Sequence, residues 1–283
     1  MQETPPCARN WKVVSGAFLA IFVLAGLANA QGKNLIQSFY SDLLASYSSE
    51  WSPQPGQALR GADRISKASS EDIRTALPAI LATVTHRDAR IQSFGALAVY
   101  AVGERSDGAE LLKPYLSSIA TLFDSDSRLQ LTCAAVLSTM KPAPPAEVVP
   151  LLTAFVEKAD RDTRAQVHAI SALLRVAGPR PEVVRAITTF FSRPVPSAVK
   201  ADALNALGTP RATDPRLWNI AIQGLGDSSV AVRMTAPQVL RRMGPEALQH
   251  ATPALEAVIN RKGEAAEVKR FVREALQVPS QSR

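Results

Sequence analysis

The sequence predicts an all-α protein built from repeated pairs of helices, and three observations support this prediction. Ala, Leu and Val dominate a chain of 283 residues that is 46% hydrophobic and only 6% aromatic, a balance that favours helices over sheets. The 20 Pro and 14 Gly residues are frequent enough to divide the chain into many short elements. A short motif returns at intervals near 36 residues, which is typical of helical repeat proteins.

Residues 1–30 have the pattern of a secretory signal peptide. Arg9 and Lys12 precede an apolar run at 13–27, and the small residue Ala30 follows shortly after it. We therefore expect cleavage after Ala30, a secreted or periplasmic protein, and no stable membrane span in the mature chain. The alternative is a signal that stays uncleaved and anchors the protein in a membrane.

The next segment, 31–70, is expected to contain a capping helix and a linker. Apolar residues from 35 to 47 fall on one face of a helix, which we expect to cover the first repeat. Residues 48–70 contain two Pro and two Gly residues and are expected to form a poorly ordered connection. The repeats are expected to occupy 71–278, followed by a tail at 279–283.

A repeated motif defines the helix pairs. Asp-x-Arg-x-Gln occurs three times, and later copies keep a basic residue after Val. Apolar residues at helical spacing follow each basic residue and predict the second helix of a pair, and similar stretches before it predict the first helix. The basic residues recur every 33 to 38 residues: Arg90, Arg128, Arg164, Lys200, Arg233 and Lys269. The first helices are expected at 73–84, 111–123, 148–156, 183–191, 217–225 and 247–259.

Three acidic residues, Asp88, Asp126 and Asp162, stand just before these second helices. Their side chains can accept hydrogen bonds from the exposed amides of the first helical turn. Recurrence at the same place in successive repeats indicates capping rather than acid–base catalysis. The loops also lack the Gly and the terminal Glu of a calcium-binding hand.

Paired helices of this length, with Pro in the first helix and Asp before an Arg-x-Gln or Val-Arg start to the second, resemble HEAT repeats. The pattern is most similar to the HEAT-like repeats of phycobilisome lyases and covers residues 71–277. The resemblance implies a right-handed α-solenoid of about six HEAT-like, armadillo-like helix pairs, used mainly for binding and assembly. Since one pair alone cannot offset its loss of chain entropy, each pair should lean on its neighbours.

The residues offer little for catalysis. The chain has no glycine-rich phosphate loop, no Gly-x-Ser-x-Gly, no His-Glu-x-x-His and no Cys-x-x-Cys. Its histidines, His86, His168 and His250, lack the adjacent Glu that HEAT-like di-iron hydroxylases use. Cys133 is expected to be a buried structural thiol, because no His lies near it in the repeat. We predict no catalytic residue, no metal and no cofactor.

The remaining alternative for chemistry is a lyase-like or hydrolytic enzyme built on the same solenoid. It requires a pocket that joins Cys133, His168 and a carboxylate.

The basic residues leave two roles open. In the first, each bonds a turn Asp or a neighbouring carbonyl group and ties repeats together. In the second, part of the row faces a concave groove together with Arg241, Arg242, Arg270 and Arg273. The whole chain has a net charge of +7. A basic groove of this kind would attract an acidic protein, a polysaccharide or an anionic lipid surface.

A protein is the expected partner of this groove. Nucleic acid is not expected, because the export signal directs the chain away from the genome and no aromatic residues alternate with the basic ones. The sequence therefore predicts an exported, non-catalytic binding or scaffold protein, with a mechanical spacer in the cell envelope as a third possibility.

Overall fold

A computed structural model describes residues 63–87 and 89–277, without the side chains of residues 89–91, 93 and 94. The expected signal peptide at 1–30, the expected capping helix at 35–47 and the expected tail at 279–283 lie outside this range. The described residues form thirteen α-helices and three short 3-10 helices, with no strand, which confirms the all-α class. None of these helices is both long and apolar enough to cross a membrane.

The chain divides into two compact units, and unit 1 ends at Pro114. Its described helices are α4 (Ser70–Val84), α5 (Ala89–Gly103) and α6 (Gly108–Leu112). Ser69 caps α4 by accepting a hydrogen bond from the Asp72 amide at 3.1 Å. The apolar face of α4 is fully buried and packs against α5.

The end of the expected linker is ordered in unit 1. Residues 63–67 are helical, and the side chain of Ile65 is only 1% exposed. Arg105 holds this turn by donating to the carbonyl oxygens of Ile65, Ser66 and Ala68 at 2.8 to 3.1 Å. The prediction of a poorly ordered connection is therefore wrong for residues 63–67, because a tertiary contact from 40 residues away satisfies the carbonyl groups of the turn.

One predicted first helix is broken in the structure. Instead of one helix over 111–123, the chain forms α6, the 3-10 turn Lys113–Tyr115, α7 (Leu116–Thr121) and the 3-10 turn Leu122–Asp124. Pro114 lies at the break. Proline lacks the backbone donor and clashes with the preceding turn, so a helix does not continue through it without distortion.

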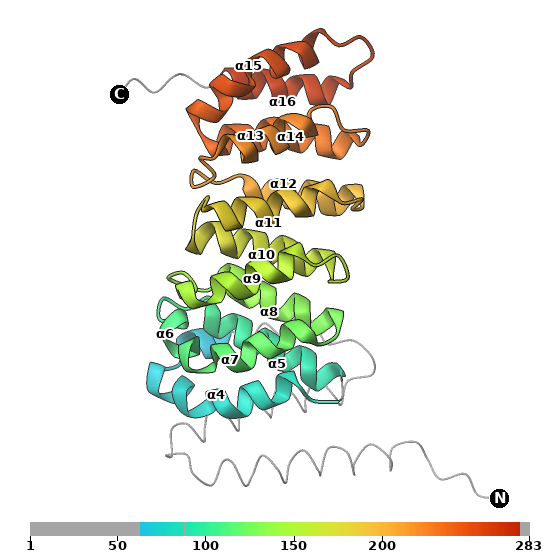
Figure 1. Ribbon diagram of the computed structural model, residues 1–283. Helices are drawn as coiled ribbons and strands as arrows, with labels where there is room; N and C mark the ends of the chain where they lie inside the picture. Colours follow the sequence, from blue (N-terminus) through green and yellow to red (C-terminus); the bar gives the residue numbers. More distant parts are fainter. Residues whose placement is uncertain (1–62, 88, 278–283) are drawn as a thin grey trace, which may run out of the picture. The chain divides into compact units, whose positions relative to one another are not determined.

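Unit 2 begins at Tyr115 and contains five second helices stacked beside one another (Figure 1). These second helices are α8 (Ser127–Thr139), α10 (Thr163–Val176), α12 (Ser197–Leu207), α14 (Val230–Met243) and α16 (Ala266–Leu276). The first helices after α7 are α9 (Val149–Glu157), which the 3-10 turn Ala146–Val148 precedes, α11 (Pro181–Ser192), α13 (Pro215–Gly224) and α15 (Pro245–Asn260). First helices contact first helices and second helices contact second helices, so the pairs form a two-layer stack.

Proline and glycine set the boundaries between pairs. Pro181, Pro215 and Pro245 begin first helices, where the missing amide hydrogen costs nothing. Gly244 ends α14 with φ of 114°, a conformation that side chains with a Cβ rarely adopt.

The second helices share one register when positions are counted from the N-cap residue as position 0. These N-caps are Asp126, Asp162, Pro196, Ser229 and Ala265. Position +7 is small in four of the five helices and fully buried in all: Cys133, Ala169, Ala203, Ala236 and Val272. Position +11 is a buried leucine in the first four: Leu137, Leu173, Leu207 and Leu240. Each buried leucine contributes roughly 1.5–3 kcal/mol, so this register fixes how the pairs stack.

Candidate binding surface

Five of the six basic residues expected to form one row lie in described second helices of unit 2, and they belong to two different positions. Arg128 and Arg164 are at position +2 of their helices, whereas Lys200, Arg233 and Lys269 are at position +4. The residues equivalent to these three are Gln130 and Gln166, the last residues of the sequence motif. The prediction of a single basic row is therefore wrong. The caps set the register of the helices, and the spacing of charges does not follow it.

The aspartates of the motif do cap their helices. Asp126 accepts hydrogen bonds from the amides of Arg128 and Leu129, both at 3.0 Å, and Asp162 accepts one from the Ala165 amide at 2.9 Å. This confirms the expectation for these two repeats. Asp88 and the side chain of Arg90 lie outside the described residues.

The side chains of Arg128 and Arg164 are exposed. Neither makes a hydrogen bond or an ion pair to any residue of the described chain, and the same holds for the half-buried Lys269. This contradicts the expectation that these three basic side chains bond the turn aspartates. A cation in the first turn also lies at the positive end of the helix dipole, so neither arginine gains stability from its place in the helix.

The glutamines at position +4 form the hydrogen bonds to nearby backbone groups that the arginines were expected to form. Gln130 is 5% exposed; its Nε2 donates to the Ser125 carbonyl at 2.9 Å, and its Oε1 accepts from the Asp162 amide at 2.9 Å. Gln166 is fully buried. It donates to the carbonyl oxygens of Phe155, Val156 and Lys158 at 2.7 to 3.1 Å.

Further along the stack, the residues at position +4 are charged, and two of the three form ion pairs with the next pair of helices. Lys200 Nζ lies 2.5 Å from Asp227 Oδ2, and Arg233 Nη2 lies 3.0 Å from Glu264 Oε1. Burial alone would raise the pKa of both carboxyl groups, but hydrogen bonds and the neighbouring cations lower it below its ordinary value. These two basic residues therefore match the structural role expected for them.

Basic residues after the first helices reach back by one repeat. Arg161 donates to the Phe123 carbonyl at 3.1 Å and pairs with Asp124 at 2.9 Å, while Arg193 donates to the carbonyl oxygens of Lys158 and Val156 at 2.7 and 2.9 Å. Arg261 donates to the Leu225 carbonyl at 3.2 Å. Each guanidinium satisfies carbonyl groups that a helix end leaves without partners. The side of unit 2 formed by these turns is called the N-terminal edge, because the second helices begin there.

The opposite side, where the second helices end and lead to the next pair, is called the C-terminal edge. Arg175 donates to the carbonyl oxygens of Ser138, Met140 and Pro142, the last two at 2.6 and 2.7 Å. Arg211 donates in turn to the Arg175 carbonyl. Burial and the charge of Arg211 lower the pKa of Arg175. A sequence signal for this edge exists, since the basic residues Lys141, Arg175 and Arg211 recur at intervals of 34 and 36 residues.

The four arginines proposed for the groove have separate environments. Arg242 donates to Asn205 Oδ1 at 2.8 Å, which makes it part of the repeat contacts, and Arg273 is exposed. The Arg270 guanidinium lies 4.9 Å from the Phe271 ring centre and 3.6 Å from Glu274 Oε1.

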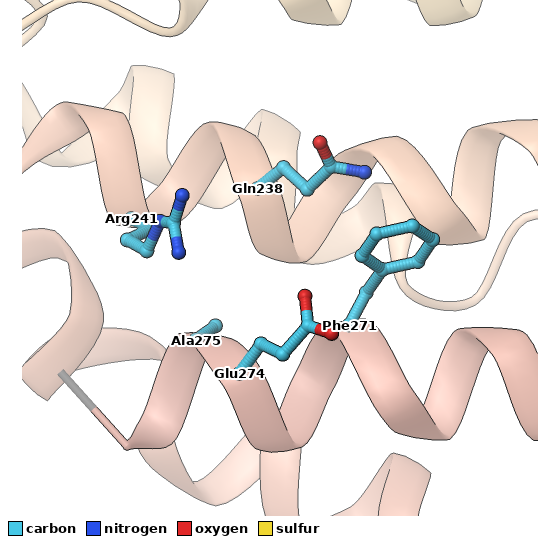
Figure 2. Close-up of a pocket in the computed structure, with 5 residues that line it drawn as sticks. All are labelled: Gln238, Arg241, Phe271, Glu274 and Ala275. Carbon is cyan, nitrogen blue, oxygen red and sulfur yellow. The ribbon is translucent and has the colours of Figure 1, made fainter.

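Arg241 points with Gln238 from α14 toward Phe271, Glu274 and Ala275 of α16 (Figure 2). The five side chains line a shallow depression with a volume of about 40 Å³.

Cys133 and His168 have different partners. The Cys133 thiol donates to the Ile119 carbonyl at 3.2 Å, and burial raises its pKa, which confirms that it is a buried thiol. His168 Nδ1 lies 3.1 Å from Ser138 Oγ, and burial lowers its pKa against the opposing charge of Asp202. No group of three or more His, Cys, Asp or Glu residues within the described ranges is arranged to hold a metal ion.

No protein-family model and no curated protein matches the chain. Among solved structures, the chain is similar to an engineered protein from a structural genomics consortium, with a TM-score of 0.44 and 20% identity over 88% of this chain and 68% of the other. It is also similar to two designed armadillo repeat proteins, at TM-scores of 0.37 and 0.40 with 15% and 12% identity; each match covers 83% of this chain and 97% of the other. The second was solved in complex with the peptide (KR)4. At these scores, the description of the fold rests on the helices of this chain itself.

Proposed function

We propose that this protein is an exported, non-catalytic binding or scaffold protein that holds a protein partner on the exposed face of the second helices in unit 2. One observation carries the proposal. The fold leaves a row of apolar side chains half-buried at position +5 of four successive second helices: Leu131, Val167, Ala201 and Met234.

A second row lies one turn further along the same helix face, at position +9. It changes from small to polar along the stack, through Ala135, Ser171, Asn205, Gln238 and Glu274, and the last three are exposed. An apolar row beside a polar row is the composition of a protein-binding surface, whose centre excludes water while its rim stays hydrated. The rows cross several repeats, which suits an extended macromolecule.

The depression between α14 and α16 supports a macromolecular partner over a small one. Its volume of about 40 Å³ is well below the roughly 300–1,000 Å³ of pockets that enclose organic ligands. Arg241 and Phe271 at its margin are of residue types that are enriched in protein interfaces. The raised pKa of Cys133 supports a structural thiol rather than a nucleophile at neutral pH.

Two finer parts of the proposal come from the sequence. The pattern of residues 1–30 supports export with cleavage after Ala30, and the motif spacing supports membership of the HEAT-like repeats. Sequencing the N-terminus of the mature protein tests the first part. We expect it to begin at Gln31, and an intact N-terminus on a membrane-bound protein would favour the uncleaved anchor.

Site-specific photo-crosslinking in the producing cells tests the binding face. We expect a photoreactive residue at Gln238, on the second helices, to give one discrete protein adduct that excess unlabelled protein competes away. The matched control is Glu256, an exposed residue of the first helix α15, which should give no such adduct. Equal adducts from both positions, or none from Gln238, would contradict the proposal.

A further inference from the structure

Basic side chains without acidic partners gather at the C-terminal edge of unit 2. They lie in the last turns of the second helices or in the loops to the next pair, on the side opposite the loops within pairs (Figure 1). Their members are Lys141, Arg175, Arg180, Arg211, Arg241 and Arg242. Among the described residues, none of the six forms an ion pair with a carboxylate.

The hydrogen bonds that these residues make do not neutralise their positive charges, because the acceptors are uncharged. Arg175 and Arg211 donate only to backbone carbonyl oxygens, and Arg242 donates to the neutral amide of Asn205. All six except the half-buried Arg175 are exposed. Partial burial and mutual repulsion between Arg175 and Arg211 make this edge a place where an added anion lowers the electrostatic energy.

The N-terminal edge is different, because three of its half-buried cations already have anions. Asp124, Asp227 and Glu264 pair there with Arg161, Lys200 and Arg233. An acidic partner would have to compete with these pairs, at the cost of the contacts that hold the repeats together. Unpaired cations such as Arg128 and Arg164 also occur at the N-terminal edge, but each of these two stands two residues after a capping aspartate. At the C-terminal edge, no ion pair among the described residues joins one repeat to the next.

The C-terminal edge also carries acidic residues, which restrict what can bind. Glu182 and Glu246 stand in the first turns of α11 and α15, and Glu147 stands in the 3-10 turn before α9. A continuous anionic surface, such as a lipid headgroup layer, would bring negative charge against these residues. A single chain that places its carboxylates selectively would avoid them.

We infer that the C-terminal edge of unit 2 docks an extended acidic segment of the protein partner. This rests on the proposed binding function and adds to it a second surface and the chemistry of what that surface takes. Packed helices lie about 8–10 Å apart, and an extended chain rises about 3.3 Å per residue. A carboxylate at every third residue of the segment therefore meets a basic residue on each successive repeat, where guanidinium and carboxylate form charge-assisted hydrogen bonds.

The test measures binding of a fluorescent peptide of repeated Glu-Ser-Ser units to the full chain at low salt, by fluorescence anisotropy. The variant Lys141→Glu with Arg180→Glu changes two exposed side chains that make no hydrogen bond or ion pair within the described residues. The control, Arg128→Glu with Arg164→Glu, makes the same charge change at the N-terminal edge. We expect the first variant to weaken binding by about tenfold or more and the control by less than about twofold, with unchanged melting temperatures.

Equal weakening by both variants would overturn the inference, since it would indicate attraction to net charge alone. It would also be overturned if vesicles of phosphatidylglycerol bound in a manner that depends on Lys141 and Arg180 while the peptide did not bind. The crosslinking at Gln238 is independent of these results. An adduct there with no peptide binding would remove the acidic segment and leave the proposed function standing.

Discussion

The two edges of unit 2 use the same kind of residue and reach different electrostatic results. At both edges, arginines reach back about one repeat to carbonyl groups at the ends of helices, as Arg193 does at the N-terminal edge and Arg175 at the C-terminal edge. At the N-terminal edge, carboxylates such as Glu264, whose side chain is 1% exposed, also join one repeat to the next. At the C-terminal edge, Asp214 pairs, among the described residues, only with Arg216, two residues away. The comparison teaches that long-range caps hold both edges, whereas ion pairs join successive repeats at the N-terminal edge only, among the described residues of unit 2.

The largest expected effect is a difference in stability between two variants at the N-terminal edge, one at position +4 and one at position +2. Replacing Gln166 by Ala removes the hydrogen bond to the Phe155 carbonyl and leaves a cavity, because the side chain is fully buried. We expect a loss of about 2–3 kcal/mol in the free energy of unfolding, measured by urea denaturation. The exposed neighbour Arg164→Ala is the control and should change stability by less than about 0.5 kcal/mol. The reverse order would restore the arginine as the repeat anchor.

The buried carboxylate of the N-terminal edge gives the next effect and a pH dependence. Glu264→Gln leaves Arg233 without its anion and should cost about 1–3 kcal/mol at neutral pH. Because the pKa of Glu264 in the folded protein is lower than its ordinary value of 4.5, its contribution is present above that pH and is lost as the pH falls through the folded value. Stability curves of both proteins from neutral to acid pH should therefore converge below about 4.5, and parallel curves would refute this account.

At the C-terminal edge, stability should depend on the caps rather than on the charges. Arg175→Ala removes hydrogen bonds to three carbonyl groups while relieving repulsion from Arg211, so we expect a loss of about 1–2 kcal/mol. Arg180→Ala removes an exposed guanidinium from the same edge and should be nearly neutral. Chemical denaturation of the two variants side by side measures the difference. A larger loss for Arg180→Ala would show that the edge is stabilised in another way.

The smallest effect concerns His168, which lies between the two edges beside Ser138. Its folded pKa is lowered mainly by burial, so the unfolded chain binds more protons as the pH falls below the ordinary value of 6.5. The wild type should therefore lose stability toward lower pH by a modest amount, and His168→Gln should lose less over the same range. Unfolding midpoints measured in buffers on either side of pH 6.5 compare the two slopes. Identical slopes would mean that His168 is as well solvated as in the unfolded chain.

Much of the fold could be predicted from the sequence because repetition made a local signal visible several times. The 36-residue spacing and the apolar residues at helical spacing located the first helices of unit 2, and the repeated Asp located two caps. Pro114 was visible too, but its consequence, two short helices in place of one, depended on how far the surrounding contacts could tolerate a lost backbone hydrogen bond.

The binding surface was harder to predict, because the contacts that define it join residues about one repeat apart. Arg128 and Lys200 correspond to each other in the sequence by their charge. The cap residues Asp126 and Pro196, however, place these two side chains about half a helical turn apart. Gln130 and Gln166 belong to the motif, but as neutral side chains they gave no charge pattern that would indicate contacts to turn groups. The spacing of Lys141, Arg175 and Arg211 was equally readable in the sequence, but only the fold shows which carbonyl groups Arg175 and Arg211 reach.

The contrast between the edges is tested most directly by two double charge reversals compared in the same urea denaturation series. Lys200→Glu with Arg233→Glu places two anions against Asp227 and Glu264 at the N-terminal edge, whereas Lys141→Glu with Arg180→Glu makes the same change in charge at the C-terminal edge. We predict that the first variant loses about 3 kcal/mol or more, or fails to fold, and that the second stays within about 0.5 kcal/mol of the wild type. Equal losses from the two variants would contradict the account.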